Sequence, residues 1–190
     1  MKYYWMMYDF DKSVIENYII STETINDTLP DYSVCCGKYV ENWNPDTTLI
    51  CNNLEETVVP DYLCDVKDWM VVSYQFIDAI RPFEDGAIQY LPIKVDAVQP
   101  QMQGKKYYVA NVIRVLDVLD YEKSDWFYMS DNKTRALVFG VLKREAIKNN
   151  HIFIIKRDLL SDWVIVSETV KDVIEKAKLV GFKFCEMCVI

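Results

Sequence analysis

Few residues of this chain have the types and spacing that catalysis requires. A serine or cysteine nucleophile needs a neighbouring base, and the only histidine of the sequence is His151. It lies between Asn150 and an apolar segment, without a flanking aspartate or a glycine-rich elbow. The sequence also lacks the phosphate-loop, dinucleotide-binding, zinc-protease and hydrolase-elbow motifs. These patterns predict no catalytic site.

Paired carboxylates are the other candidates for acid–base chemistry. Glu55-Glu56 and Glu84-Asp85 are adjacent pairs, and adjacent side chains in loops usually point apart into solvent. Carboxylates from distant segments can still meet in the folded chain and act as acid and base. A small enzyme built on such gathered carboxylates is therefore the alternative to a protein without catalytic activity.

Cysteines could bind a metal or exchange disulfides, and six of them stand at positions 35, 36, 51, 64, 185 and 188. Cys185 and Cys188 form a C-x-x-C motif, which could be half of a zinc site or a redox pair. A second C-x-x-C is missing, and this one does not open a helix. We therefore expect these two, and the adjacent Cys35 and Cys36, to be small apolar residues on strands. No metal and no cofactor is predicted.

The composition favours a folded, cytoplasmic chain. With 190 residues, of which 51% are apolar and 14% aromatic, the protein fits one domain with a substantial core. No apolar run approaches the roughly 20 residues of a membrane helix, and the N-terminal residues lack the apolar core of a signal peptide. We therefore expect no membrane association, and cysteines that remain reduced.

Charge is distributed unevenly along the sequence. Residues 1–68 contain 13 acidic and four basic residues, whereas residues 69–190 contain 16 acidic and 17 basic ones. An acidic protein is a poor match for nucleic acid, which is bound through basic residues. The asymmetry fits a basic protein partner. A solvated face that only aids solubility is the alternative.

One pattern occurs twice, as residues 68–80 (DWMVVSYQFIDAI) and 162–174 (DWVIVSETVKDVI), with six identities at a constant offset. In each copy a β-branched run ends at a serine, Ser73 or Ser167, and apolar residues follow at helical spacing. Serine is a preferred helix N-cap. A glycine beyond each helix, Gly86 or Gly181, suits a left-handed C-terminal cap. Each copy therefore predicts strand, capped helix, glycine stop and strand, as a duplicated unit within one domain.

Most other segments resemble strands, because they are rich in β-branched and aromatic residues. For two of them, 106–119 and 135–142, a helix is the competing interpretation. Pro82 is expected to kink or close the first repeated helix near Arg81. The segments predicted as strands are residues 2–10, 87–95, 106–119, 135–142, 151–156 and 182–189, with a short helical turn at 143–150.

These elements predict an α+β fold with a mixed, mostly antiparallel sheet and a few short helices. Residues 31–60 read as a meander of short strands and loops, since Gly37, Pro45 and Pro60 interrupt them. We expect an acidic strand and loop region, residues 1–67, packed on a main α+β domain, residues 68–190.

Four segments carry a family resemblance through their order and spacing: VVSYQFIDAIRPFEDGAIQYLPIKV (71–95), GKKYYVANVIRVLDVLD (104–120), HIFIIKRD (151–158) and VIVSETVKDVIEKAKLVGFKFCEM (164–187). Together they resemble the Imm11 family of bacterial immunity proteins, which occur beside polymorphic toxins. The N-terminal third shares only a short aromatic opening, KYYWMMYDF, and Cys185 and Cys188 are not part of the family pattern. The resemblance implies an antitoxin that binds a cognate toxin without catalysis.

The leading hypothesis is thus a cytoplasmic immunity protein that binds one toxin domain with a basic surface. A small enzyme that uses gathered carboxylates and a generic adaptor module are the alternatives. Acidic residues in the turns of the N-terminal third are the predicted partner contacts: Asp46, Glu55, Glu56, Asp61 and Asp65.

Overall fold

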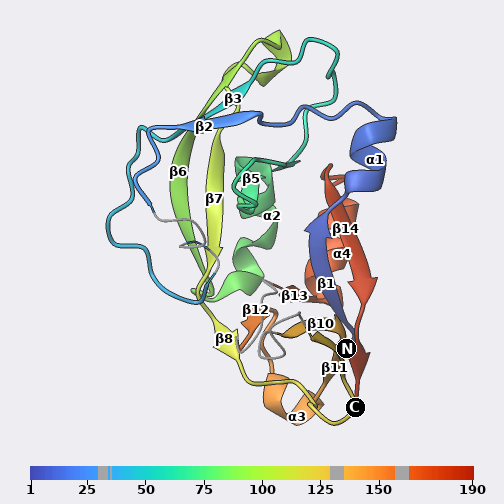
Figure 1. Cartoon of the computed structure of the whole chain (residues 1–190). Coiled ribbons are helices and arrows are strands. Elements are labelled where there is room, and N and C mark those ends of the chain that lie inside the picture. Colours follow the sequence, from blue (N-terminus) through green and yellow to red (C-terminus); the bar gives the residue numbers. More distant parts are fainter. Residues whose placement is uncertain (30–33, 35, 129–134, 157–162) are drawn as a thin grey trace.

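The computed structural model describes residues 1–29, 34, 36–128, 135–156 and 163–190. Its architecture is α+β, with mixed sheets and short helices, which confirms the predicted fold class (Figure 1). The described helices are α1 (Phe10–Ile15), α2 (Tyr74–Glu84), α3 (Arg144–Ile147), α4 (Glu168–Lys176) and the 3-10 turn η1 (Pro100–Met102). None of them combines the length and the apolar character that a membrane-spanning segment requires.

One large sheet has six strands. Their order is β2 (Glu23–Ile25), β3 (Thr48–Cys51), β6 (Ile88–Ala97), β7 (Tyr107–Val112), β5 (Val71–Ser73) and β4 (Tyr62–Leu63). The β3–β6 pair is parallel and the other pairs are antiparallel.

The second large sheet joins the two ends of the described chain. Its five strands lie in the order β14 (Phe182–Glu186), β1 (Tyr3–Tyr8), β13 (Val164–Ser167), β12 (Ile152–Ile155) and β8 (Val115–Leu116). Strand β1 is antiparallel to both β13 and β14. Two short pairs complete the described strands: β9 (Asp125–Tyr128) with β10 (Arg135–Phe139), and β11 (Val141–Leu142) with β15 (Cys188–Val189).

Each copy of the repeated pattern forms a strand, a helix and a second strand. In both copies one antiparallel strand lies between the two: β7 between β5 and β6, and β1 between β13 and β14. The predicted serine caps are confirmed, because the Ser73 hydroxyl accepts from Phe76 N (3.3 Å) and the Ser167 hydroxyl accepts from Val170 N (3.4 Å). That the copies arose by duplication stays a prediction.

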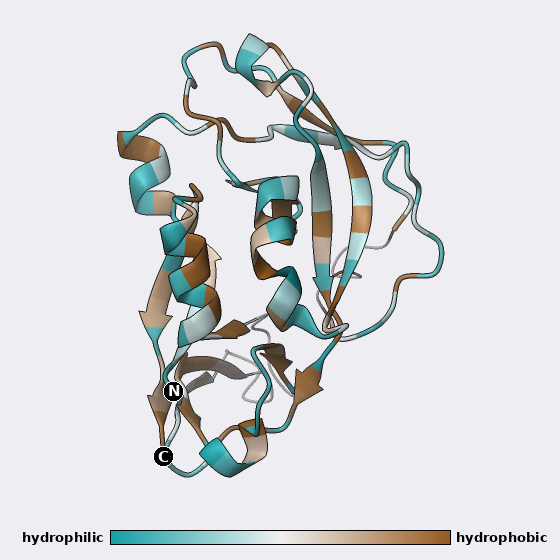
Figure 2. Ribbon diagram, turned by 180° about the vertical axis from the view of Figure 1, so that it is seen from behind, coloured by the Kyte–Doolittle hydropathy of each residue, from teal (hydrophilic) through white to brown (hydrophobic). Residues whose placement is uncertain are grey.

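Helices α2 and α4 pack against each other, and Figure 2 shows them side by side in front of the two large sheets. Their apolar stripes turn inward, where Phe76 of α2 stacks on Phe182 of β14 at 5.0 Å between ring centroids. Buried residues of both sheets meet here in one core cluster, whereas Tyr3, Phe153 and Ile165 of the second sheet belong to another. The division of the chain at residue 68 stays a prediction.

Three local predictions were wrong, one of them in part. Helix α2 does not close near Arg81, one of the two expected outcomes, but runs through Pro82 to Glu84, and a kink at Pro82 stays a prediction. Proline removes only one helical hydrogen bond, and Phe83 beyond it packs against the core. The predicted strand at 106–119 splits into β7 and β8, which belong to different sheets. After α4 the left-handed residue is Lys178 (φ 55°), and Gly181 lies three residues further on.

Candidate partner-binding surface

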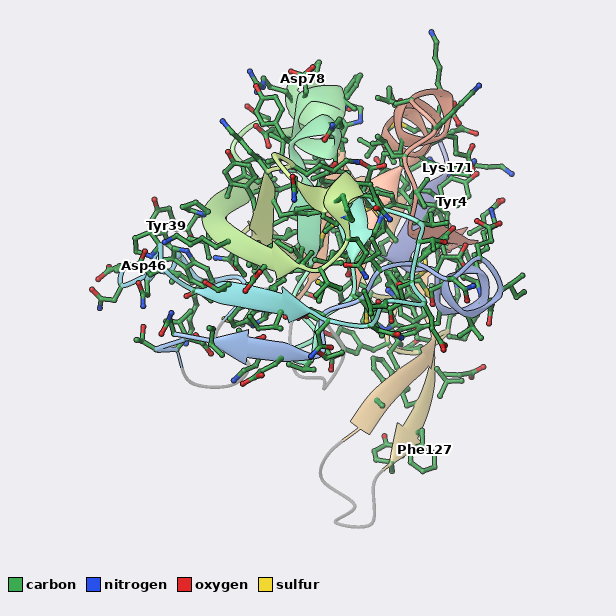
Figure 3. All side chains as sticks on the ribbon, turned by 90° about the horizontal axis from the view of Figure 1, so that it is seen from above. Tyr4, Tyr39, Asp46, Asp78, Phe127 and Lys171 are labelled. Atoms are coloured by element: carbon green, nitrogen blue, oxygen red, sulfur yellow. The ribbon has the colours of Figure 1, made fainter. Side chains whose placement is uncertain are left out.

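Two of the five predicted contact residues are exposed, and both flank β3. Asp46 lies in the turn before this strand and accepts a hydrogen bond from Lys94 Nζ at 2.6 Å, while both side chains stay largely open to solvent. Glu55 lies in the loop after it and is also exposed. Figure 3 shows Asp46 at the outer edge of the molecule, on a different side from Asp78 of α2.

The structure places the other three carboxylates inside the protein. Glu56 accepts from Ile20 N (2.9 Å) and from Asn53 Nδ2 (3.1 Å), so it ties the loop after β3 to the segment after α1. Asp61 and Asp65 are 9% and 5% exposed. A buried side chain offers little surface to a partner, so Glu56, Asp61 and Asp65 are not brought onto one surface with Asp46 and Glu55.

Sequence reasoning did not single out several acidic residues that are exposed in the same third of the chain. They surround α1, the edge strand β2 and the loops near β3 and β4, and all lie in the region whose charge balance is negative. The negative charge balance of residues 1–68 could have pointed to these residues, but it does not indicate which carboxylates reach solvent. The additional exposed residues are Asp11, Glu16, Glu23, Glu41 and Asp68.

His151 has a structural role in this fold. Its Nδ1 lies 2.8 Å from the Ser167 hydroxyl, and its ring meets Phe83 edge-on. A serine beside a histidine is the arrangement of a catalytic nucleophile, but Ser167 is 0% exposed and caps α4. A substrate therefore cannot reach this hydroxyl in the structure.

The cysteines give no metal site among the described residues. Cys185 lies on β14 and Cys188 on β15, and both are free thiols on terminal strands, as the sequence predicted. Cys35 lies outside the described residues. Within the described ranges no cluster of histidine, cysteine and carboxylate ligands could hold a metal ion.

A pocket of about 190 Å³ lies between β1, the start of α1 and the loop after β4. Aromatic rings line it from β1 and from the loop, and so do the carboxylates of Asp65 and Asp68. Asp65 Oδ1 accepts from Trp69 N at 2.8 Å. Its other oxygen, Oδ2, is buried and has no hydrogen-bond partner among the described residues. The charged form of Asp65 is therefore poorly solvated, and burial raises its pKa to about 7.

This raised pKa makes the stability of the fold depend on pH. An acid whose pKa is higher in the folded than in the unfolded state binds more protons when folded, so its contribution is full below pH 4 and is lost as the pH rises to about 7. Three pKa units correspond to at most about 4 kcal/mol, and relaxation around the charge reduces that figure.

We therefore expect Asp65→Asn to stabilise the protein at pH 8 by about 1–3 kcal/mol and at pH 5 by less than about half of that amount. The amide keeps an oxygen for Trp69 N and removes the buried charge. Urea unfolding of the parent and the variant at both pH values measures the difference in their free energies of unfolding. Taking this difference at each pH cancels the titration of all other groups. An equal difference at pH 5 and pH 8 would show that Asp65 does not titrate between them.

Comparison with protein families gives one match. The family model described as "Immunity protein family (Imm11)" matches residues 11–189 of the chain. This range includes both repeated segments and every described strand except β1. No curated protein matches the chain.

Proposed function

The chain belongs to the Imm11 immunity protein family, and from that membership we propose that it binds a cognate toxin directly in the cytoplasm and neutralises it without catalysing a reaction. An immunity protein of this kind inhibits the toxin by remaining bound to it, so it needs the contacts of a protein interface and no catalytic groups. The family match over residues 11–189 is the observation that carries this proposal.

The exposed acidic residues supply the electrostatic part of the proposed interface. Asp46 and Glu55 are the two predicted contacts that reach solvent, and the same third of the chain holds further exposed carboxylates. A toxin that acts on nucleic acids or nucleotides has a basic cleft, which an acidic surface complements. Complementary charge mainly speeds association and selects the partner.

Catalysis by gathered carboxylates is the second candidate, because Asp65 and Asp68 line the same pocket. Its volume of about 190 Å³ is below the range of roughly 300–1,000 Å³ that holds small-molecule ligands. The buried hydroxyl of Ser167 offers no nucleophile to a substrate. A second pocket of about 330 Å³ is lined by Asp9, Glu16 and Glu175, so the family match, and not pocket size, favours a binding role.

Co-expression tests the immunity function. The probe is the C-terminal domain of the polymorphic toxin encoded beside this gene, expressed from an inducible promoter in a sensitive host. We expect the chain to restore growth and to form a stoichiometric complex with the toxin domain on gel filtration. Growth arrest despite soluble expression of the chain would refute the proposal.

Reversing the exposed charges should slow binding. We expect Asp46→Lys combined with Glu55→Lys to lower the association rate constant about 10-fold at low salt and to weaken its salt dependence. Stopped-flow or surface-based kinetics at several salt concentrations measures both. The matched control is Asp78→Lys combined with Asp172→Lys, exposed acids on α2 and α4 that change the net charge equally. Equal slowing by both pairs would indicate net charge instead of a local surface.

A further inference from the structure

We propose that the pocket beside Asp65 receives an arginine side chain of the toxin and anchors the complex. This inference rests on the proposed function, because it names a contact within the proposed interface. The site is the aromatic and acidic pocket between β1 and the loop after β4, and it does not contain the exposed contacts Asp46 and Glu55.

One buried oxygen atom of a pocket-lining residue, Asp65 Oδ2, has no hydrogen-bond partner among the described residues. Buried polar atoms are nearly always paired in folded proteins, so this carboxylate oxygen indicates a missing donor. A guanidinium carries five N–H donors and no acceptor, so it can supply both the hydrogen bond and the positive charge that a carboxylate lacks here.

The pocket also suits the shape of an arginine side chain. Its volume of about 190 Å³ is roughly six times the ~30 Å³ that one water molecule occupies in the liquid. Trp5 and Trp69 line it, and Trp5 is held in place by stacking on Trp163 at 4.1 Å. Planar guanidinium groups stack on such rings and interact with their faces more favourably than an ammonium does.

Exposed apolar surface adjoins the pocket. Phe10, the first residue of α1, lines the pocket and is 60% exposed. Helix α1 has no buried residue, and its Val14 is 79% exposed. A partner that covers this surface would exclude water from the pocket, and hot spots of protein interfaces lie in such desolvated pockets.

The cost of the buried Asp65 charge also favours a bound cation. In the isolated protein its carboxylate is costly near neutral pH, since burial raises its pKa to about 7. An inserted cation would favour the charged form and relieve that cost. Replacing Asp65 with asparagine should therefore give a more stable protein that binds more weakly, a combination that general damage to the fold does not produce.

Toxin binding provides the first test. We expect Asp65→Asn to raise the Kd for the toxin domain about 30- to 300-fold, mainly through faster dissociation. Glu56→Gln is the matched control, because Glu56 is a buried carboxylate outside the pocket, and we expect it to change Kd less than about threefold. Equal affinity of Asp65→Asn and the parent, or equal losses in both variants, would overturn the proposal.

The pH dependence gives a second readout. Only the carboxylate form of Asp65 binds a cation. The fraction of protein with an ionised Asp65 rises from about 0.1 at pH 6 to about 0.9 at pH 8, so the Kd of the parent for the toxin should fall about 9-fold. The other titratable or charged groups around Asp65 are Tyr8 from β1, Tyr62 from β4, and Cys64, Lys67 and Asp68 from the loop after β4. Asp65→Asn should lose this dependence, and an unchanged profile would contradict the assignment.

A small probe separates the pocket from the toxin. We expect N-acetyl-arginine methylamide to shift the indole N–H resonances of Trp5 and Trp69 saturably at millimolar concentration, with Trp126 as internal reference. The neutral citrulline analogue and Asp65→Asn should show no such shift. If the chain fails to neutralise the toxin, the proposed function fails, and a saturable arginine-specific shift still supports a guanidinium site. No shift in the parent chain would overturn the site even if neutralisation succeeds.

Discussion

Replacing Asp61 with alanine is expected to destabilise the fold by about 3–5 kcal/mol, because its side chain joins the two repeated segments. Asp61 Oδ1 accepts from the Ser73 hydroxyl at 2.7 Å, and Oδ2 accepts from Val180 N at 2.9 Å. Ser73 begins α2, whereas Val180 follows α4. Alanine would leave a buried hydroxyl and a peptide N–H without acceptors, and each orphaned group costs about 1–3 kcal/mol.

The conservative variant and a double-mutant cycle make this expectation specific. Asp61→Asn keeps an oxygen for Val180 N, and the hydroxyl of Ser73 can rotate to accept from the amide, so we expect a loss of only about 1 kcal/mol. Asp61→Ala and Ser73→Ala should couple by about 1–3 kcal/mol in urea unfolding. Asp46→Ala, which removes an exposed ion pair, should cost less than about 1 kcal/mol.

Asp61 was also predicted as a partner contact, and the same variants address that prediction. If Asp61→Ala keeps the stability of the parent but loses toxin binding, Asp61 acts at the interface. If it loses stability, while Asp61→Asn binds the toxin normally, its role is to hold the fold.

Local sequence patterns predicted the starts of the two repeated helices correctly. Capping by Ser73 and Ser167 could be predicted because an N-cap involves only the next three residues. The assignment of residues 106–119 to one strand was wrong, since the division into β7 and β8 depends on pairing with β5 and β6 in one sheet and with β12 in the other.

The candidate surface was harder to predict, because the burial of a carboxylate in a loop depends on distant partners. Asp61 is covered through a contact 119 positions away in the sequence. Asp65 is enclosed by β1, from the other end of the N-terminal region. Composition correctly located the acidic third, but only the folded chain distinguishes Asp46 and Glu55, which reach solvent, from the three buried carboxylates.

Replacing Gly181 with alanine is the other change with a large expected effect. Gly181 has φ 101°, and a Cβ there would lie 2.6 Å from the carbonyl oxygen of Tyr62 and 3.2 Å from its N and Cβ atoms. Backbone atoms of β4 cannot move aside as a flexible side chain would. We therefore expect a loss of about 3–5 kcal/mol, which combines a strained left-handed conformation with a displaced strand.

Gly86, which directly follows the C-cap residue of α2, provides a control. Its φ of 69° is also left-handed, but a Cβ there would meet nothing within 4 Å. Gly86→Ala should therefore cost only the conformational strain, about 1–2 kcal/mol. Chemical unfolding of both variants measures the contact with β4 as the difference between the two losses. If the two losses were equal, the close approach of Gly181 to Tyr62 would not contribute to stability.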